Sequence, residues 1–209
     1  EKICPINDEN EKKATYQIIE RLSLFYYRYI FAKNTFFKIM PPDLFYDEFI
    51  EPDFYSQYVP KEFENISKQY FQILNSNHKI TPVLYAIGKY YYDDPKNRKN
   101  GEFDVVTLDK NGYNFYEVKF INKPIDDSIV NEEEYQLENL KIKYNKLGFI
   151  SKTGFNLKNP EKYKGKTMIV GSVTDGYNYF EAKYKRTRAF LEEMQGSGIN
   201  LIITTKSNL

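Results

Sequence analysis

The chain has 209 residues, 41% hydrophobic and 17% aromatic, which is enough apolar surface for one sizeable core with an extension. Its 30 basic and 29 acidic side chains leave a formal net charge of +1, so overall charge points to no nucleic acid, membrane or acidic substrate. Cys4 is the only cysteine, which excludes an internal disulfide framework, and the single histidine, His78, excludes a histidine-based zinc site. With no signal peptide and no apolar run long enough for a bilayer, we expect a cytoplasmic protein without a membrane partner.

Residues 1–58 are predicted to form a helical arm with irregular connections. Within them, residues 17–31 have the pattern of a largely buried helix, and several prolines interrupt the segment that follows. The acids between Asp47 and Asp53 are separated by aromatic residues, which is more typical of a docking surface than of a metal site. We therefore expect the arm to pack against the core, a second copy or a neighbouring module.

Residues 59–74 are predicted to form an amphipathic helix, because apolar side chains recur there at helical spacing. A turn of 100° per residue places Glu62 and Glu64 on opposite margins of the apolar stripe. Either carboxylate would reach a neighbouring site. Both also suit the first turn of a helix, where acids interact favourably with the helix dipole, so the sequence leaves their role open.

The next feature is a predicted β-hairpin formed by residues 101–108 and 113–120, with Asn111-Gly112 at its turn. Asn and Gly both tolerate the positive φ that a primed turn requires. Because side chains alternate along a strand, we expect one face of the first strand to carry Asp104, Val106 and Leu108. One face of the second strand is expected to carry Phe115, Glu117 and Lys119.

Asp104, Glu117 and Lys119 would then converge beside apolar neighbours. Two carboxylates this close repel each other unless a cation lies between them, and their hard oxygen atoms suit Mg²⁺ or Mn²⁺. A lysine beside such an ion would position or deprotonate a water, or stabilise charge on a pentavalent phosphorus. This combination favours metal-assisted hydrolysis of a phosphodiester.

An acid, a spacer and then Glu-x-Lys is the motif of the PD-(D/E)XK nuclease superfamily, and Asp104, Glu117 and Lys119 resemble it. The resemblance implies a restriction-endonuclease-like α/β fold and a first-helix glutamate at the metal site, which the Phe63-Glu64 pair matches as Glu64. It also implies a glutamine near the site or substrate, matched by Gln136 on a helix predicted over residues 128–147. From the sequence alone, Gln136 is equally a boundary polar residue.

The predicted buried stripe of this helix consists of Leu137, Leu140, Tyr144 and Leu147. The acids that open it, Asp126, Asp127 and Glu132 to Glu134, are expected to serve only the helix dipole.

A narrower resemblance extends over residues 12–155. It is to the uncharacterised nuclease-like domain at the C-terminus of archaeal-type P-loop ATPases, and it implies a P-loop ATPase partner in the same or another chain. The segments that carry the resemblance occur in the expected order: Phe25–Ile30, Phe63-Glu64, Ile87–Tyr90, Glu102–Asp104, Tyr116–Phe120 and Gly148–Phe155.

The ATPase itself is missing from this sequence. Gly165-Lys166-Thr167 is the only fragment of a P-loop, and Pro160 stands where its first glycine would be. The chain begins with Glu1 rather than methionine, which favours a fragment of a longer protein, although a stand-alone protein stays open.

Charge is distributed unevenly along the chain. From Lys141 to Lys166 there are eight lysines and a single acid, Glu161. This segment would suit contacts with a DNA backbone, with Ser151 and Lys152 as candidate phosphate-binding residues, although a solvated loop explains the same lysines.

The C-terminal part contains a near-repeat, because Gly176–Tyr184 matches Gly112–Phe120 almost position by position. Glu181 and Lys183 thus correspond to Glu117 and Lys119. No acid stands where Asp104 would, so we interpret the copy as degenerate and structural. A helix over residues 186–194 and a strand over residues 199–205 are predicted to follow.

Together these features predict a mixed sheet flanked by helices, with an arm (1–58), a nuclease-like core (59–155) and a C-terminal extension (156–209). The predicted activity is Mg²⁺- or Mn²⁺-dependent hydrolysis of DNA, with Asp104 and Glu117 as metal ligands, Glu64 as an outer ligand and Lys119 positioning the water. Two other classes stay open. One is a catalytically silent nucleic-acid-binding or regulatory module of an ATPase, and the other is a protein-interaction domain, for example a homodimer built on the arm.

Overall fold

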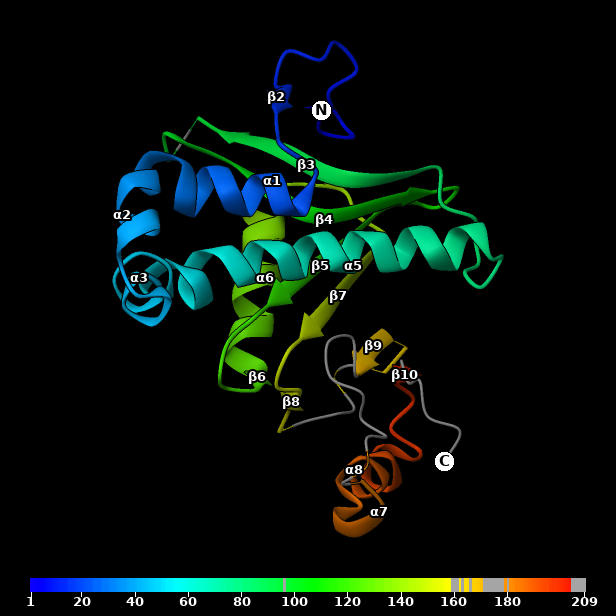
Figure 1. Ribbon diagram of the computed structural model, residues 1–209. Helices are drawn as coiled ribbons and strands as arrows, with labels where there is room; N and C mark the ends of the chain where they lie inside the picture. Colours follow the sequence, from blue (N-terminus) through cyan, green and yellow to red (C-terminus); the bar gives the residue numbers. More distant parts are fainter. Residues whose placement is uncertain are drawn as a thin grey trace.

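The computed structural model describes residues 1–95, 97–158, 162, 164–165, 167–170, 179 and 181–203. Its centre is a mixed sheet with strand order β10-β9-β7-β5-β4-β3, flanked by helices as predicted (Figure 1). Strands β3, β4 and β5 are antiparallel, whereas β5, β7, β9 and β10 run parallel to one another. The strands of this sheet are β3 (Ala86–Asp94), β4 (Lys99–Asp109), β5 (Gly112–Lys119), β7 (Lys146–Ser151), β9 (Thr167–Val170) and β10 (Asn200–Ile203).

Shorter strand pairs lie outside the central sheet. The antiparallel pair is β1 (Lys2–Ile3) with β2 (Thr15–Tyr16), and the parallel pair is β6 (Ile125–Asp126) with β8 (Phe155–Asn156). The helices are α1 (Arg21–Phe25), α2 (Asn34–Ile39), α3 (Pro42–Phe49), α4 (Glu51–Asp53), α5 (Val59–Ser76), α6 (Asp127–Asn139), α7 (Glu181–Tyr184) and α8 (Arg186–Met194). Tyr26–Ile30 and Phe54–Tyr58 are π-helical, and Phe31–Lys33 is a 3₁₀ turn.

The predicted hairpin is confirmed as β4 and β5. Asp109 pairs with Gly112, so Lys110 and Asn111 form the loop between them. The Asp109 side chain accepts the Asn111 amide at 2.7 Å and the Asn114 side-chain amide at 2.9 Å. Gly112 has a φ of +120°, whereas Asn111 is not left-handed. The expectation of positive φ at both residues was therefore wrong, because the Asp109 carboxylate holds the turn instead.

Helices α5 and α6 cover opposite faces of the sheet (Figure 1). The predicted helix over residues 59–74 is confirmed as α5. Its Phe63 and Phe71 pack with Val105, and the Phe71 ring lies 4.4 Å from the Tyr116 ring. On the other face, α6 packs against the sheet through a buried cluster formed by Val106, Phe115, Ile129, Val130 and Leu137.

The helix predicted over residues 128–147 ends much earlier, at Asn139. Lys141 has a φ of +53°, which breaks the helical path, and β7 begins at Lys146. Leu147 is buried, as predicted, but in this strand. Leu147 to Ile150 form a continuous apolar run, which is typical of a parallel strand that is covered on both faces. Periodicity alone cannot separate such a run from a buried helix.

The N-terminal arm is helical from Arg21 onward, but it is much less buried than predicted. Tyr29, Phe45 and Ile50 form a small cluster of their own within the arm. The outer face of the first helix stays in solvent, with Leu22 75% exposed. A cluster this small covers only one side of each arm helix, which explains the difference.

In the C-terminal part, the predicted helix over residues 186–194 is confirmed as α8, and the predicted last strand is confirmed over Asn200–Ile203 as β10. The strand repeat is not seen in its described part, because Glu181–Tyr184 forms helix α7. The Glu181 carboxylate accepts the amides of Thr187 and Arg188, so it caps the next helix. The remaining repeat residues, 176–178 and 180, and the P-loop-like positions Pro160 and Lys166 lie outside the described residues.

Candidate functional site

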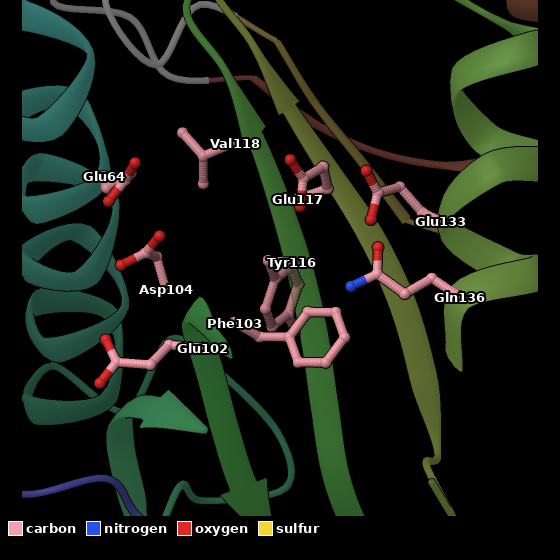
Figure 2. Close-up of a pocket in the computed structure, with 9 residues that line it drawn as sticks. All are labelled: Glu64, Glu102, Phe103, Asp104, Tyr116, Glu117, Val118, Glu133 and Gln136. Carbon is pink, nitrogen blue, oxygen red and sulfur yellow. The ribbon is translucent and has the colours of Figure 1, made fainter. Parts of the chain in front are cut away.

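A pocket of about 210 Å³ is lined by residues from α5, from α6 and from the hairpin strands β4 and β5 (Figure 2). Four of the predicted site residues line it: Glu64 from α5, Asp104 from β4, Glu117 from β5 and Gln136 from α6. The other lining residues are Glu102, Phe103, Tyr116, Val118 and Glu133. The pocket wall is therefore dominated by acids from different elements.

A β-bulge in β4 turns Asp104 toward α5. Gly88 pairs with Val106 and Tyr90 with Phe103, so three residue steps in β4 stand opposite two in β3. The extra residue lets Phe103 and Val106 both pack on the α6 side, while the Asp104 carboxylate contacts α5. The expectation that Asp104 and Val106 share a face was wrong for this reason, because a bulge re-aims one side chain.

The Asp104 carboxylate is held by lysines. Lys61 Nζ lies 2.5 Å from Asp104 Oδ1 and 2.6 Å from Glu64 Oε2, so this ammonium group contacts both carboxylates. Lys89 Nζ lies 3.5 Å from the same Asp104 oxygen and also pairs with Glu102. Burial opposes ionisation of Asp104, but the hydrogen bond from Lys61 and the charges of Lys61, Lys89 and Lys68 lower the pKa of Asp104. Asp104 is therefore ionised at neutral pH.

Glu64 is in a less favourable position. Its Oε2 atom is buried and accepts no hydrogen bond of good geometry from the described residues, although the Lys61 ammonium lies within ion-pair distance. Burial, and then the nearby Asp104 carboxylate, raise the pKa of Glu64. A buried carboxylate oxygen without a hydrogen bond is stabilised by a nearby cation.

Glu117 and Lys119 lie on the α6 side of β5 with Phe115, as alternation predicts. Lys119 Nζ contacts Glu117 Oε1 at 2.6 Å and Glu133 Oε1 of α6 at 3.3 Å. Burial, and then repulsion from Glu133, raise the pKa of Glu117. Burial alone would lower the pKa of Lys119, but the Glu117 and Glu133 carboxylates raise it, so Lys119 is an ammonium group at neutral pH.

Sequence reasoning missed Glu133, Lys61 and Lys89 as site residues. Glu133 was assigned only to the helix dipole, yet it lines the pocket beside Gln136. The signal was present in the sequence, because residues three apart lie on one face of a helix. Gln136 donates from Nε2 to the Tyr92 hydroxyl at 3.4 Å, which holds its amide at the pocket rim.

Ser151 and Lys152 lie outside this pocket. The Ser151 side chain is buried, and its hydroxyl accepts the amides of Thr153 and Gly154, so it shapes its own turn. Lys152 donates to Asn122 Oδ1 at 2.7 Å and lies 4.5 Å from the centre of the Phe120 ring.

Lys152 lines an adjoining cleft, which borders the first pocket at Glu117 and Val118. Lys119 and the end of β5 form one wall of this cleft. The cleft is also lined by Tyr55 and Ser56 of the arm and by Pro60 at the start of α5. The arm therefore contributes directly to the surface beside the acidic pocket.

The donor set of the pocket is made of carboxylate oxygens, which suit Mg²⁺ or Mn²⁺ rather than softer metals. As the side chains stand, no group of three or more acidic, cysteine or histidine residues in the described ranges is close enough to hold a metal ion. The pair that converges best is Glu64 and Asp104, because both contact the same ammonium group.

Fold and site together define a mixed α/β protein with an acidic pocket between two helices that flank a hairpin. Residues 26–146 match the model of the DUF234 family, described as archaeal and bacterial proteins of unknown function. The match covers more than half of the chain, which therefore belongs to this family. Comparison with curated proteins and with solved structures gave no match. Each helix that the structure describes is too short or too polar to cross a membrane.

Proposed function

We propose that this protein is a metal-dependent nuclease of the PD-(D/E)XK type that hydrolyses phosphodiester bonds in DNA. The observation that supports this most strongly is the meeting of Glu64, Asp104 and Glu117 at one pocket, with Lys119 in contact with Glu117. These residues come from a helix and two strands, so their convergence is a property of the fold and not of a single segment.

Glu64, Asp104 and Glu117 would hold Mg²⁺ or Mn²⁺. The buried Oε2 of Glu64 accepts no hydrogen bond of good geometry from the described residues, and the neighbouring carboxylates repel each other, so a divalent cation in the place of the Lys61 ammonium group would be stabilised here. Such an ion supplies Lewis-acid polarisation of the phosphate and a lowered pKa for a bound water.

Lys119 acts as a charged group in this proposal and not as a base. Its pKa is raised by Glu117 and Glu133, so it keeps its proton at neutral pH. The contacts with Glu117 and Glu133 hold this ammonium group in place, and its hydrogen bonds would orient a water and stabilise negative charge that develops on the phosphate. Of the alternatives that the sequence left open, this geometry supports positioning and charge stabilisation over proton removal.

The adjoining cleft offers a path for the nucleic-acid strand. It begins where the acidic pocket ends, at Glu117 and Val118, and it presents the rings of Tyr55 and Phe120 together with Lys152. Aromatic faces stack on bases, and lysines contact phosphates. A phosphate near Lys119 would therefore have its neighbouring nucleotide in this cleft.

The arm is the proposed docking surface for a P-loop ATPase module or for a second copy of the chain. The ATPase assignment rests on the resemblance of the sequence to the ATPase-linked nuclease-like domains. Large exposed apolar side chains of the arm favour an interface of some kind: Leu22, Tyr26, Tyr27, Phe31, Phe36, Phe37 and Ile39.

The test is cleavage of supercoiled plasmid and of labelled linear DNA and RNA in the presence of Mg²⁺ or Mn²⁺. Asp104→Ala and Lys119→Met should each reduce the cleavage rate at least about 100-fold, because each removes a group that acts in the transition state. Asp93→Ala is the matched control, since Asp93 is an exposed acid on the same sheet. If Asp104→Ala or Lys119→Met cleaves DNA as fast as an active wild type, the residue replaced has no part in the mechanism.

One observation favours the catalytically silent alternative. Each candidate metal ligand already lies within 4 Å of a lysine of this chain, since Lys61 contacts Glu64 and Asp104, and Lys119 contacts Glu117. These ion pairs stabilise the carboxylates without a metal ion. In that case Lys119→Ala would leave nucleic-acid binding and assembly intact, and calorimetry would show no Mn²⁺ binding to the folded wild type.

A further inference from the structure

Lys61 lies between two carboxylates of the acidic pocket. It is the third residue of α5, and the helical path continues upstream through the π-helical turn Phe54–Tyr58, so Lys61 is not at a free helix end. Its ammonium nitrogen lies 2.5 Å from Asp104 Oδ1 and 2.6 Å from Glu64 Oε2.

The two carboxylate oxygens approach the same nitrogen from different elements, Asp104 from β4 and Glu64 from α5 (Figure 2 shows the two carboxylates). Since each lies so near the nitrogen, the oxygens are at most about 5 Å apart. A divalent cation needs carboxylate oxygens at about 2.0–2.6 Å, so it would occupy nearly the same point as the ammonium group. Lys61 and a metal ion cannot both be there.

Among the described lysines near Asp104, Lys61 is the one best placed to leave. Its side chain is 44% exposed, whereas that of Lys89 is 11% exposed and is also paired with Glu102. Lys68 is further along α5, and burial lowers its pKa while the Asp104 charge raises it. Rotation of the flexible Lys61 side chain would carry its charge into solvent at small cost.

We propose that Lys61 is an internal counter-ion that occupies the metal position, so that a divalent cation binds only by displacing it. This inference rests on the proposed function, because it assigns the regulation of the same metal site. The displaced ammonium group would then lie at the pocket mouth, where a phosphate of the substrate would attract it. Lys61 thus keeps the carboxylates paired when no ion is bound and lowers the affinity for the ion.

The experiment is Mn²⁺ titration of the full chain by calorimetry, in the absence of nucleic acid, with free Mn²⁺ measured by its paramagnetic resonance signal. Lys61→Gln should bind Mn²⁺ roughly tenfold more tightly than wild type, because no ion pair has to be broken. Lys68→Gln is the matched control. Lys68 is on the same helix, and its charge also acts on Asp104 without a direct ion pair to it.

A second readout is the thermal midpoint with chelator and with Mn²⁺. Lys61→Gln should have a lower midpoint than wild type in chelator and a larger rise on addition of Mn²⁺. Lys61→Met is the second variant, in case Lys61→Gln does not fold, and it should give the same result.

The outcomes separate the two proposals. Wild-type binding with equal or weaker binding by the folded Lys61 variants would overturn the counter-ion role alone and leave the metal site standing. An equal gain for Lys68→Gln and Lys61→Gln would also overturn it, since general charge and not occupancy would then be responsible. Absence of Mn²⁺ binding by both wild type and the folded Lys61 variants would overturn the metal site itself, and the inference with it.

Discussion

Replacing Asp104 with Asn tests both the geometry of the pocket and the charge that we assign to it. The Asp104 carboxylate lies 2.5 Å from Lys61 Nζ. Coulomb's law with an effective dielectric constant of about 20 gives an attraction of roughly 7 kcal/mol at that separation. Both side chains are partly exposed, 32% for Asp104 and 44% for Lys61, so solvent screening and desolvation reduce the net contribution to about 1 kcal/mol. Asp104→Asn should therefore lower the free energy of unfolding by about 1 kcal/mol at neutral pH without metal.

The pH dependence of this loss has a definite sign. The folded-state pKa of Asp104 is lowered, so its stabilising contribution is present above the unfolded pKa of about 3.9 and is lost as the pH falls through the folded value. Urea unfolding in chelator, from pH 7 downward, should show the difference between wild type and Asp104→Asn shrink below about pH 4. Mn²⁺ at about 100 times its dissociation constant should add roughly 2.7 kcal/mol to wild type and much less to the variant. Asp93→Asn should behave as wild type. A loss that is the same at every pH would refute the ion-pair reasoning.

Two further substitutions have expected outcomes of their own. The folded-state pKa of Glu117 is raised, so ionisation of Glu117 costs stability as the pH rises through the unfolded and then the folded pKa. Glu117→Gln should therefore raise the free energy of unfolding at pH 7. Urea unfolding should show that gain vanish below about pH 4, and a less stable variant at pH 7 would contradict it. Gly148→Ala should destabilise the sheet by about 1–3 kcal/mol, because the added Cβ would lie 2.7 Å from Cδ1 of Tyr116, which packs on Phe71. Unchanged unfolding of Gly148→Ala in urea would show that this contact relaxes freely.

The hairpin and α5 were predictable because their signals are local. A short Gly-containing turn between aromatic and β-branched segments fixes two strands, and a helical repeat of apolar residues fixes one face of α5. Both elements are where the sequence predicted them, and they bring Glu64, Asp104 and Glu117 to one pocket. Alternation along β5 also placed Glu117 and Lys119 together.

The remaining features depend on contacts between distant segments. The bulge at Asp104 follows from pairing with β3, which no pattern inside β4 reveals. The apolar run at Leu147 has a pattern that would also fit a buried helix. It is identified as a strand only by its place in a sheet that α5 and α6 cover on both faces. No local pattern marks Lys61 as a site residue, because its contact with Asp104 of β4 arises only in the folded chain, where neighbouring carboxylates attract an ammonium group as they would a metal ion.

The bulge explains why the pocket exists between the two helices. In a regular β4 strand, Asp104 would lie on the α6 side with Val106, close to Glu117 and Glu133 and away from Glu64. Three carboxylates would then crowd one face and raise one another's pKa values. The extra residue turns Asp104 to the α5 side, where Lys61 and Glu64 meet it, and leaves Glu117 with Lys119 and Glu133 on the other. Some of the acids thus face α5 and the others face α6, while all of them line one cavity. A bound cation would draw these acids together.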